Sequence, residues 1–398
     1  MKFTTTVSAL LSAIEITKPT MDKKGMSADL YIRASDTTNI IQFYSTNMTS
    51  ETFTKVKGEK TVVEESGEVL VNPSKLSGGL AGLDAKTQVT INTNPSGDTF
   101  KVVAGPVKFS LRVSVNVKEI AAKMNSLPSD KTEAVATIPV AELSEFTKRT
   151  TFCIPTDLTG QRAPLAALKL SDNETGEEAF ATDGSIAVHV SSSKKQGKGS
   201  GLGIKGLLIP NTALQPLQSI VAKRNGKESV DIVVLQNKVY FRFADGTRFG
   251  ALTMATQYPN LRSVIDNATV FSFEVQTDIL KHSLTRTSNF IPTGAKNRTL
   301  EVEFGDDKVT LRASQDGVFV ESVPVTYKGS KPNAPVKMGF DIQYLFDIVS
   351  NSQSSLLTFG FSKDTAPIVV TDQNKTTDDD EKINTKYVVM GVRLGAQK

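Results

Sequence analysis

Three aspartates that each precede a glycine are the first candidates for chemistry in this chain of 398 residues. A carboxylate held in a tight loop, as at Asp183, Asp245 or Asp316, can act as a general acid or base. Each Asp-Gly pair also lies between two segments of alternating apolar residues, where this dipeptide is typical of a hairpin turn. We therefore interpret the pairs as turns, and a functional role stays open only at Asp183.

The other reactive or ligand-binding patterns in the chain are incomplete. Residues 201–206 have the glycine spacing of a dinucleotide-binding loop, but the apolar stretch 207–210 follows them and not a helix. The acidic run 378–381 lacks the spaced oxygen ligands of a calcium loop. A single cysteine allows no intramolecular disulfide, and with two histidines it is too little for a typical zinc site. The sequence therefore predicts no catalytic residue, no metal and no cofactor.

The charge of the chain is nearly balanced, with 46 Lys and Arg against 42 Asp and Glu and a net charge of +4. Affinity for DNA rises with the number of phosphates that are neutralised, so this excess does not predict a tight grip on a duplex. Six basic residues lie on or beside expected helices and are candidates to face DNA: Lys148, Arg149, Lys223, Arg224, Lys281 and Arg286. If those helices share a side, their cations would contact a DNA backbone without sequence specificity. Alternatively these side chains are solvated, or complement the dipole at a helix end.

One short phrase occurs three times, and each copy joins two alternating apolar segments. The copies lie at residues 33–36, 180–184 and 312–317. A spacing of roughly 130–150 residues is the size of a domain and not of a solenoid repeat. Since 39% of the residues are hydrophobic, the chain can also build more than one core. We therefore predict three similar domains: 1–133, 134–268 and 269–398.

The same elements are expected in each predicted domain. A strand followed by a helix is predicted at 3–16, 137–152 and 271–290. A second helix is predicted at 73–83, 210–225 and 341–350, followed by alternating strands at 88–92, 229–234 and 355–361. Linkers are expected at 125–132 and 265–268, and disordered loops at 191–201 and 373–386. The predicted fold class is α+β, with two helices packed on antiparallel sheets in each domain.

The first residues of the chain resemble a short secretory leader, but Thr and Ser interrupt the apolar run. Val7, Leu10, Leu11 and Ile14 follow helical spacing, which favours an amphipathic first helix. No window approaches the roughly 18 unbroken apolar residues of a membrane span. Together with the low cysteine content, this predicts a cytoplasmic protein.

Four segments occur in this order along the chain: residues 1–4 (MKFT), 181–188 (ATDGSIAV), 258–264 (YPNLRSV) and 387–394 (YVVMGVRL). Together they resemble the bacterial DNA polymerase sliding clamp, the beta subunit of the replicative polymerase. The order and spacing match over the whole chain. The resemblance implies the DNA clamp fold, in which two chains of three similar domains close head to tail into a homodimeric ring. Helices line the hole of such a ring, and sheets lie outside.

The resemblance also implies a function in replication at the DNA of a bacterial cell. The ring would encircle duplex DNA, act as a processivity factor without catalysis, and bind the replicative DNA polymerase and the clamp loader through a peptide groove. The groove residues that it implies are Leu165, Thr182, Gly184, Ile186, Pro259, Val264, Tyr344, Val388, Met390 and Val392. At the dimer interface it places Phe109 and Leu111 against Phe290 and Ile291.

Several positions depart from the family pattern. The family usually has a basic pair after Thr-Asp-Gly, whereas only Ser185 stands between Gly184 and Ile186 here. The family also has a Tyr-rich segment that leads to the groove, and in this chain residues 162–165 are Arg-Ala-Pro-Leu instead. Gly391 replaces a common proline, and a long connection occupies residues 115–134. These differences indicate a divergent or phage-encoded member with altered partner preference. The alternatives are a structural or adhesive beta-rich repeat protein, and a hydrolase whose carboxylates come from distant parts of the chain.

Overall fold

The computed structural model describes twelve parts of the chain: residues 1–22, 28–94, 96–114, 117–157, 159–173, 176–192, 206–266, 269–292, 294, 298–362, 367–373 and 383–394. The chain folds into two compact units. Unit 1 contains Met1–Leu143 and Thr212–Met254, and unit 2 contains Ser144–Asn211 and Ala255–Lys398. The three predicted domain boundaries stay a prediction, because in each unit one continuous sheet combines strands from two of the predicted domains.

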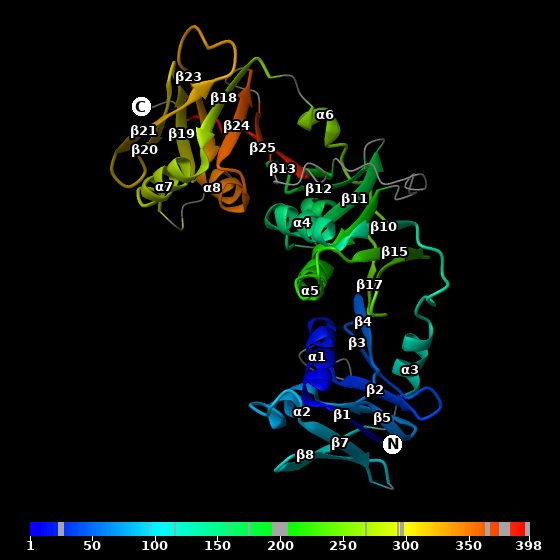
Figure 1. Cartoon of the computed structure of the whole chain (residues 1–398). Helices are drawn as coiled ribbons and strands as arrows, with labels where there is room; N and C mark the ends of the chain where they lie inside the picture. The colour runs from blue at the N-terminus through cyan, green and yellow to red at the C-terminus, as the bar shows by residue number, and fades with distance from the viewer. Residues whose placement is uncertain are drawn as a thin grey trace. The chain divides into compact units, whose positions relative to one another are not determined.

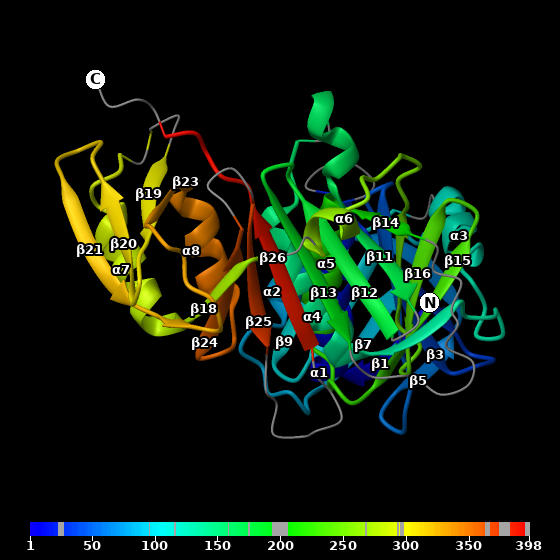
Figure 2. The same ribbon diagram turned by 90° about the horizontal axis from the view of Figure 1, so that it is seen from above.

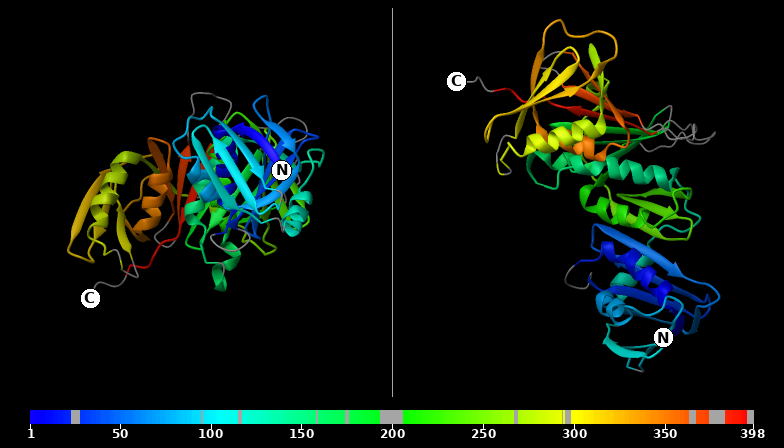
Figure 3. Two further views of the ribbon diagram at one scale, coloured as in Figure 1. Left: turned by 90° about the horizontal axis from the view of Figure 1, so that it is seen from below. Right: turned by 60° about the vertical axis from the view of Figure 1, so that its left-hand side comes forward.

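Unit 1 is built from two antiparallel sheets and helices. Its strands are β1 (Lys2–Thr6), β2 (Leu30–Ser35), β3 (Ile40–Thr46), β4 (Ser50–Val56), β5 (Val62–Glu65), β6 (Gly67–Val71), β7 (Gln88–Thr93), β8 (Thr99–Ala104), β9 (Val107–Arg112), β10 (Ala136–Pro139), β15 (Ser229–Leu235), β16 (Lys238–Phe243) and β17 (Arg248–Leu252). They form a five-stranded sheet, β5-β1-β7-β8-β9, and an eight-stranded sheet, β10-β15-β16-β17-β4-β3-β2-β6. The cyan strands β7, β8 and β9 lie side by side in the left view of Figure 3.

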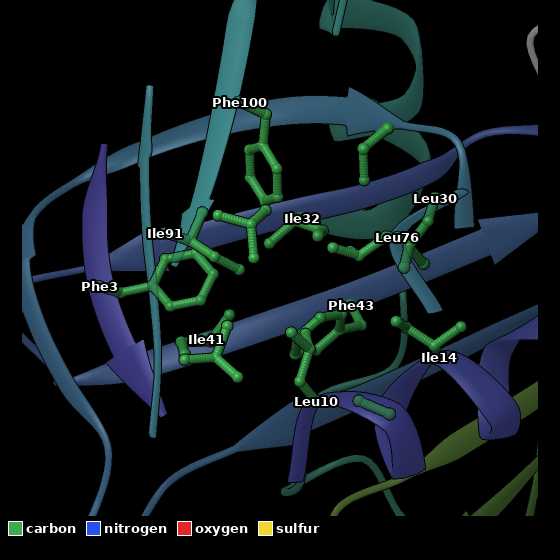
Figure 4. Packing of buried hydrophobic residues seen from close by; sticks show 14 of the residues in the cluster. Phe3, Leu10, Ile14, Leu30, Ile32, Ile41, Phe43, Leu76, Ile91 and Phe100 are labelled. Carbon is green, nitrogen blue, oxygen red and sulfur yellow. The ribbon is translucent and has the colours of Figure 1, made fainter. Parts of the chain in front are cut away.

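The helices of unit 1 are α1 (Val7–Thr17), the short η1 (Lys18–Thr20), α2 (Pro73–Gly79) and α3 (Lys118–Asn125), with most of α5 (Asn211–Val221). The hydroxyl of Thr6 accepts a hydrogen bond from the Ala9 backbone N–H at 3.2 Å and so starts α1 at the predicted place. The apolar face of α1 packs on the strands β3 and β4, and the right view of Figure 3 shows this blue helix against the blue strands. In Figure 4, Leu10 and Ile14 of α1 point toward Phe43, in the same core as Phe3.

Unit 2 has one large sheet and one small sheet. Its strands are β11 (Ala167–Asn173), β12 (Gly176–Thr182), β13 (Ile186–Ser192), β14 (Leu207–Pro210), β18 (Phe271–Gln276), β19 (Thr299–Phe304), β20 (Lys308–Ala313), β21 (Phe319–Pro324), β22 (Thr326–Tyr327), β23 (Val336–Asp341), β24 (Leu356–Phe361), β25 (Ile368–Gln373) and β26 (Ile383–Val389). The orders are β14-β11-β12-β13-β26-β25-β24-β18-β22 and β21-β20-β19-β23. Figure 2 shows β12, β13, β26 and β25 side by side, although β13 and β26 are far apart in the sequence.

The helices of unit 2 are α6 (Arg262–Ile265), α7 (Thr277–Ser288) and α8 (Ile342–Asn351), with the short η3 (Thr151–Cys153) and η4 (Gly160–Leu165). α4 (Val140–Thr150) contributes its residues from Ser144 onward. Helices α7 and α8 lie next to each other against the strands of this part of the chain (Figure 1). The buried residues Leu280 and Leu284 of α7 lie four positions apart, and Leu345 and Ile348 of α8 lie three positions apart, as expected for one face of a helix.

The order of elements predicted from the repeat is confirmed, and so are the turns at the Asp-Gly pairs. Gly184, Gly246 and Gly317 have φ values of 93°, 85° and 84°, a region that favours glycine. The second helix of the first repeat was predicted too long, because α2 ends at Gly79. The helix α3 was missed inside the connection 115–134.

The predicted bounds of the two disordered loops include residues that belong to strands. Residues 191–192 belong to β13, Gln373 ends β25, and 383–386 begin β26, because each continues a hydrogen-bonded strand pair. The remaining parts of the predicted loops, 193–201 and 374–382, lie outside the described residues, as do positions 201–205 of the glycine pattern and 378–381 of the acidic run. The predicted linkers 125–132 and 265–268 each overlap a helix by one residue, because Asn125 is the last residue of α3 and Ile265 is the last residue of α6. Among the described helices, none is both long and apolar enough to cross a membrane.

Candidate binding groove and basic residues

Unit 2 contains an apolar groove with a volume of about 340 Å³. The lining residues are Leu165, Thr182, Gly184, Ser185, Ile186, Ala187, Pro259, Leu261, Val264, Val388 and Met390. They come from the end of η4, the β12–β13 turn, the segment around α6 and the end of β26. Within the described part of the chain, no charged side chain belongs to this lining. The groove therefore suits apolar side chains of a ligand.

One wall of the groove is the turn between β12 and β13. The Asp183 carboxylate accepts hydrogen bonds from the backbone N–H groups of Ser185 and Ile186 at 2.8 and 2.9 Å. Thr182 closes the same turn, because its hydroxyl donates to the carbonyl of Ile186 at 2.7 Å. The Tyr344 hydroxyl donates to the other Asp183 oxygen at 2.7 Å, and burial together with this carboxylate raises the pKa of Tyr344 to about 12. Asp183 thus holds the shape of the turn.

Gly184 is required in this turn because its φ is 93°. We expect Gly184→Ala to lower the free energy of unfolding by about 1–2 kcal/mol, since a side chain at this φ is strained. A Cβ there would meet Leu165 at an ordinary 3.7 Å, so the strain comes from the backbone. Gly78→Ala is a matched control, because that helical position has open space around it. Urea unfolding of both variants measures the difference, and equal effects would contradict the prediction.

The rest of the groove lining includes the segment before β18 and the chain that leaves β26. Leu261 and Val264 pack on a buried cluster that includes Phe180 and Val388. The side chain of Met390 is 46% exposed, and its backbone N–H donates to the carbonyl of Ser185 at 2.9 Å. The chain that leaves β26 is therefore fixed directly to the β12–β13 turn, as a continuation of the β13–β26 pairing.

The structure brings together most of the groove residues that the resemblance implied. Tyr344 and Val392 are the two that do not line the cavity. Tyr344 points to Asp183 behind the turn, and Val392 pairs with β23, where its N–H donates to the carbonyl of Gly339 at 2.7 Å. Ser185, Ala187 and Leu261 line the groove but were not predicted. Leu261 could have been found from its spacing of three residues from Val264, which places both on one side of a helical turn.

Four of the six predicted DNA-facing residues are exposed: Lys148, Lys223, Lys281 and Arg286. Lys223 lies 3.1 Å from the carboxylate of Glu15. Arg286 contacts Glu321, which raises the pKa of the Arg286 guanidinium. These exposed pairs can exchange a carboxylate for a phosphate at small cost, since exposed ion pairs contribute little.

Arg149 does not face DNA, and this prediction is wrong. Its side chain is 1% exposed, and its guanidinium donates to Asp372 at 3.0 Å, to the hydroxyl of Thr385 at 2.8 Å and to Glu145 at 2.6 Å. Asp372 is itself 0% exposed. The helical position of Arg149 faces strands β25 and β26 instead of solvent, because the buried carboxylate compensates its charge.

Arg224 is also held away from solvent, with a side chain that is 7% exposed. It lies 2.6 Å from Asp245 and has its guanidinium carbon 4.5 Å from the ring centre of Phe243. A guanidinium held between a carboxylate and an aromatic face is not available to a phosphate. The prediction that Arg224 faces DNA is therefore wrong as well.

Three of the four residues of the predicted dimer interface lie on or against two edge strands. β9 ends the five-stranded sheet and β21 ends the four-stranded sheet, so each has one partner strand among the described residues. Phe109 and Leu111 on β9 are partly buried against the core of unit 1. Phe290 stacks on Phe319 of β21 with ring centres 4.8 Å apart. Ile291 is only 6% exposed and packs within its own unit.

Comparison with known proteins places the chain among proteins of DNA replication. The family described as DNA polymerase III beta subunit, C-terminal domain, matches residues 262–392. A beta sliding clamp from Caulobacter vibrioides is 27% identical over 312 residues, which are 75% of this chain and 76% of the relative.

Solved structures agree over almost the whole chain. The DNA polymerase III subunit beta from Pseudomonas aeruginosa has a TM-score of 0.80 at 19% identity, covering 99% of this chain and 100% of that chain. A sliding clamp from Bartonella birtlesii, solved bound to griselimycin, has a TM-score of 0.81 at 18% identity with the same coverage. The fold is therefore the α+β sliding clamp fold.

The fold and the sequence matches together define the class of protein as a DNA clamp. The chain is a distant homologue of the bacterial beta sliding clamps, the beta subunit of DNA polymerase III. By this homology it is a processivity factor of a DNA polymerase, and not an enzyme.

Proposed function

We propose that two copies of this chain close head to tail into a ring that encircles duplex DNA and slides along it. The ring carries the replicative DNA polymerase, and in turn the clamp loader, on the groove of unit 2. It acts without a cofactor at replicating DNA in the cytoplasm of a bacterial cell. The single observation that supports this most is the uncharged groove of about 340 Å³, because the clamp resemblance implied most of its lining residues from the sequence.

The two edge strands support the head-to-tail assembly. β9 of one copy and β21 of a second copy each have backbone groups available on one side, so pairing them would extend both sheets. Val318, just before β21, is 71% exposed, and Val320, on β21, is 47% exposed. Such exposure of apolar side chains is unfavourable unless a partner covers them. Because β9 and β21 are different strands, the contact between the two copies would be heterologous. Heterologous contacts form a closed ring when the rotation that relates the copies returns to the first copy.

The weak positive charge suits a ring that slides. Topological enclosure needs little attraction, and a net charge of +4 leaves the phosphate contacts few and easily exchanged. Lys148, Lys223, Lys281 and Arg286 are the exposed candidates for those contacts. They would contact the backbone alone, so binding would not depend on DNA sequence.

Topological linkage can be tested with a nicked circular DNA. The chain is allowed to reassemble in the presence of the circle, and the complex is passed through a gel-filtration column at a salt concentration that screens phosphate contacts. We expect retention on the circle and rapid loss after a restriction enzyme linearises it, because the ring can then slide off the ends. Equal loss from both forms would contradict enclosure, and so would a chain that stays monomeric at every concentration in sedimentation.

The groove can be tested separately with griselimycin, the ligand that the Bartonella birtlesii clamp was solved with. We propose that it binds this chain in the groove of unit 2, and titration by calorimetry measures the affinity. Binding that is insensitive to every change in the groove lining would contradict this assignment.

A further inference from the structure

One wall of the groove depends on a helix of a single turn. α6 is closed by hydrogen bonds from the N–H groups of Val264 and Ile265 to the carbonyl of Leu261, and from Asp266 to the carbonyl of Arg262. A helix this short is not stable by itself. Leu261 and Val264 line the groove, so whatever fixes α6 to the sheet also fixes this wall.

A buried carboxylate on the neighbouring sheet contacts α6. The side chain of Glu178, on β12, is 2% exposed. One of its oxygens accepts hydrogen bonds from the Arg262 guanidinium and from the hydroxyl of Ser171, the latter at 2.9 Å. The other oxygen lies 3.1 Å from Nε2 of His189. A carboxylate is costly to bury without such partners, so this arrangement holds Arg262 firmly.

Aromatic contacts fix the direction of the Arg262 side chain. The rings of Phe180 and His189 are stacked, with centres 4.5 Å apart and an angle of 6° between their planes. The guanidinium carbon of Arg262 lies 5.7 Å from the ring centre of Phe180. Phe180 also belongs to the buried cluster that contains Ile265. The apolar side and the charged side of α6 are therefore both held on strand β12.

We propose that Glu178 is a positioning residue for the groove: it fixes helix α6 through Arg262 and so sets the position of the wall formed by Leu261 and Val264. The inference rests on the proposed function of the groove. Glu178 does not touch the ligand in this proposal, and its effect on binding passes through α6.

The chain offers a matched control in the adjacent residue. Glu177 is 3% exposed, and its Oε2 has no hydrogen-bond partner among the described residues. Burial raises the pKa of the Glu177 carboxyl. Because successive residues of a strand point to opposite faces of the sheet, Glu177 faces away from the side that carries Glu178. The same substitution at the two positions thus separates loss of a buried charge from loss of the contact with Arg262.

The test measures griselimycin affinity for the intact chain and four variants: Glu178→Gln, Arg262→Met, the double variant and Glu177→Gln. We expect each of the first two to weaken binding about tenfold, as a loss of one charge-assisted contact would. The double variant should bind no more weakly than either single variant, because all three lose the same contact. Glu177→Gln should bind like the unmodified chain. Equal weakening by Glu177→Gln, or unchanged binding by Glu178→Gln, overturns the proposal.

Amide hydrogen exchange gives a second readout that needs no ligand. We expect faster exchange at Val264, Ile265 and Asp266 in Glu178→Gln, and no change there in Glu177→Gln. If the unmodified chain does not bind griselimycin, the proposed function of the groove fails, and exchange still decides whether Glu178 positions α6. Equal exchange in the two variants overturns the positioning role even if the groove binds.

Discussion

We expect the replacement of Met390 by aspartate to weaken the griselimycin binding proposed for the groove at least about 100-fold, with the fold and the proposed assembly unchanged. Met390 lines the groove and is 46% exposed in the free chain, so a carboxylate is tolerated there until a ligand covers it. Covering it buries a charge in a lining without any cation among the described residues, which costs several kcal/mol. Calorimetric titration measures the loss, and sedimentation checks the assembly.

Val392→Asp is the control for this prediction. Val392 lies two residues further along the same tail and is 40% exposed, but it pairs with β23 and does not line the groove. We expect its substitution to leave griselimycin binding unchanged. An unchanged affinity for Met390→Asp, or the same loss for both variants, would show that the ligand sits elsewhere.

Replacing Arg149 by methionine will lower the free energy of unfolding by roughly 3–5 kcal/mol. The substitution leaves the carboxylate of Asp372 fully buried without its cation. Among the described residues, Asp372 would then keep the backbone N–H groups of Gln353 and Ser354 as donors, at 3.2 Å each, and these do not neutralise its charge. Urea unfolding followed by circular dichroism measures the change.

Two further variants make the Arg149 prediction specific. Adding Asp372→Leu to Arg149→Met should recover most of the stability, because the uncompensated charge is then gone. Arg286→Met removes a cation whose pair with Glu321 is exposed to solvent, and we expect a much smaller loss. A loss at Arg149 no larger than the loss at Arg286 would mean that the buried pair does not stabilise unit 2.

Local chemistry explains which parts of the fold could be predicted. The start of α1 follows from the Thr6 hydroxyl and the spacing of Val7, Leu10 and Ile14, all within a few residues. The Asp-Gly turns follow from the φ that glycine alone adopts freely, as at Gly184. α3 was missed because it follows a segment without a strong cap: Val117 at its N-cap makes no side-chain hydrogen bond.

The groove was predictable in part, and only through the resemblance of whole motifs. Thr182, Gly184 and Ile186 could be assigned because they belong to one short turn. Tyr344 was also assigned to the lining, but its actual contact could not be foreseen, because its hydroxyl reaches Asp183, a residue 161 positions away in the sequence. The contact between Glu178 and Arg262 was equally invisible, because 84 residues separate the two side chains.

The sequence by itself determined the repeated order of strands and helices and the turns between them, because these depend on neighbours along the chain. Only the tertiary structure decided which basic residues are available. Lys148 and Arg149 are adjacent on α4, yet one is exposed and the other is buried against Asp372. Successive side chains of a helix point in directions about 100° apart. Only the packing of strands β25 and β26 shows that it is Arg149, and not Lys148, that meets the carboxylate of Asp372.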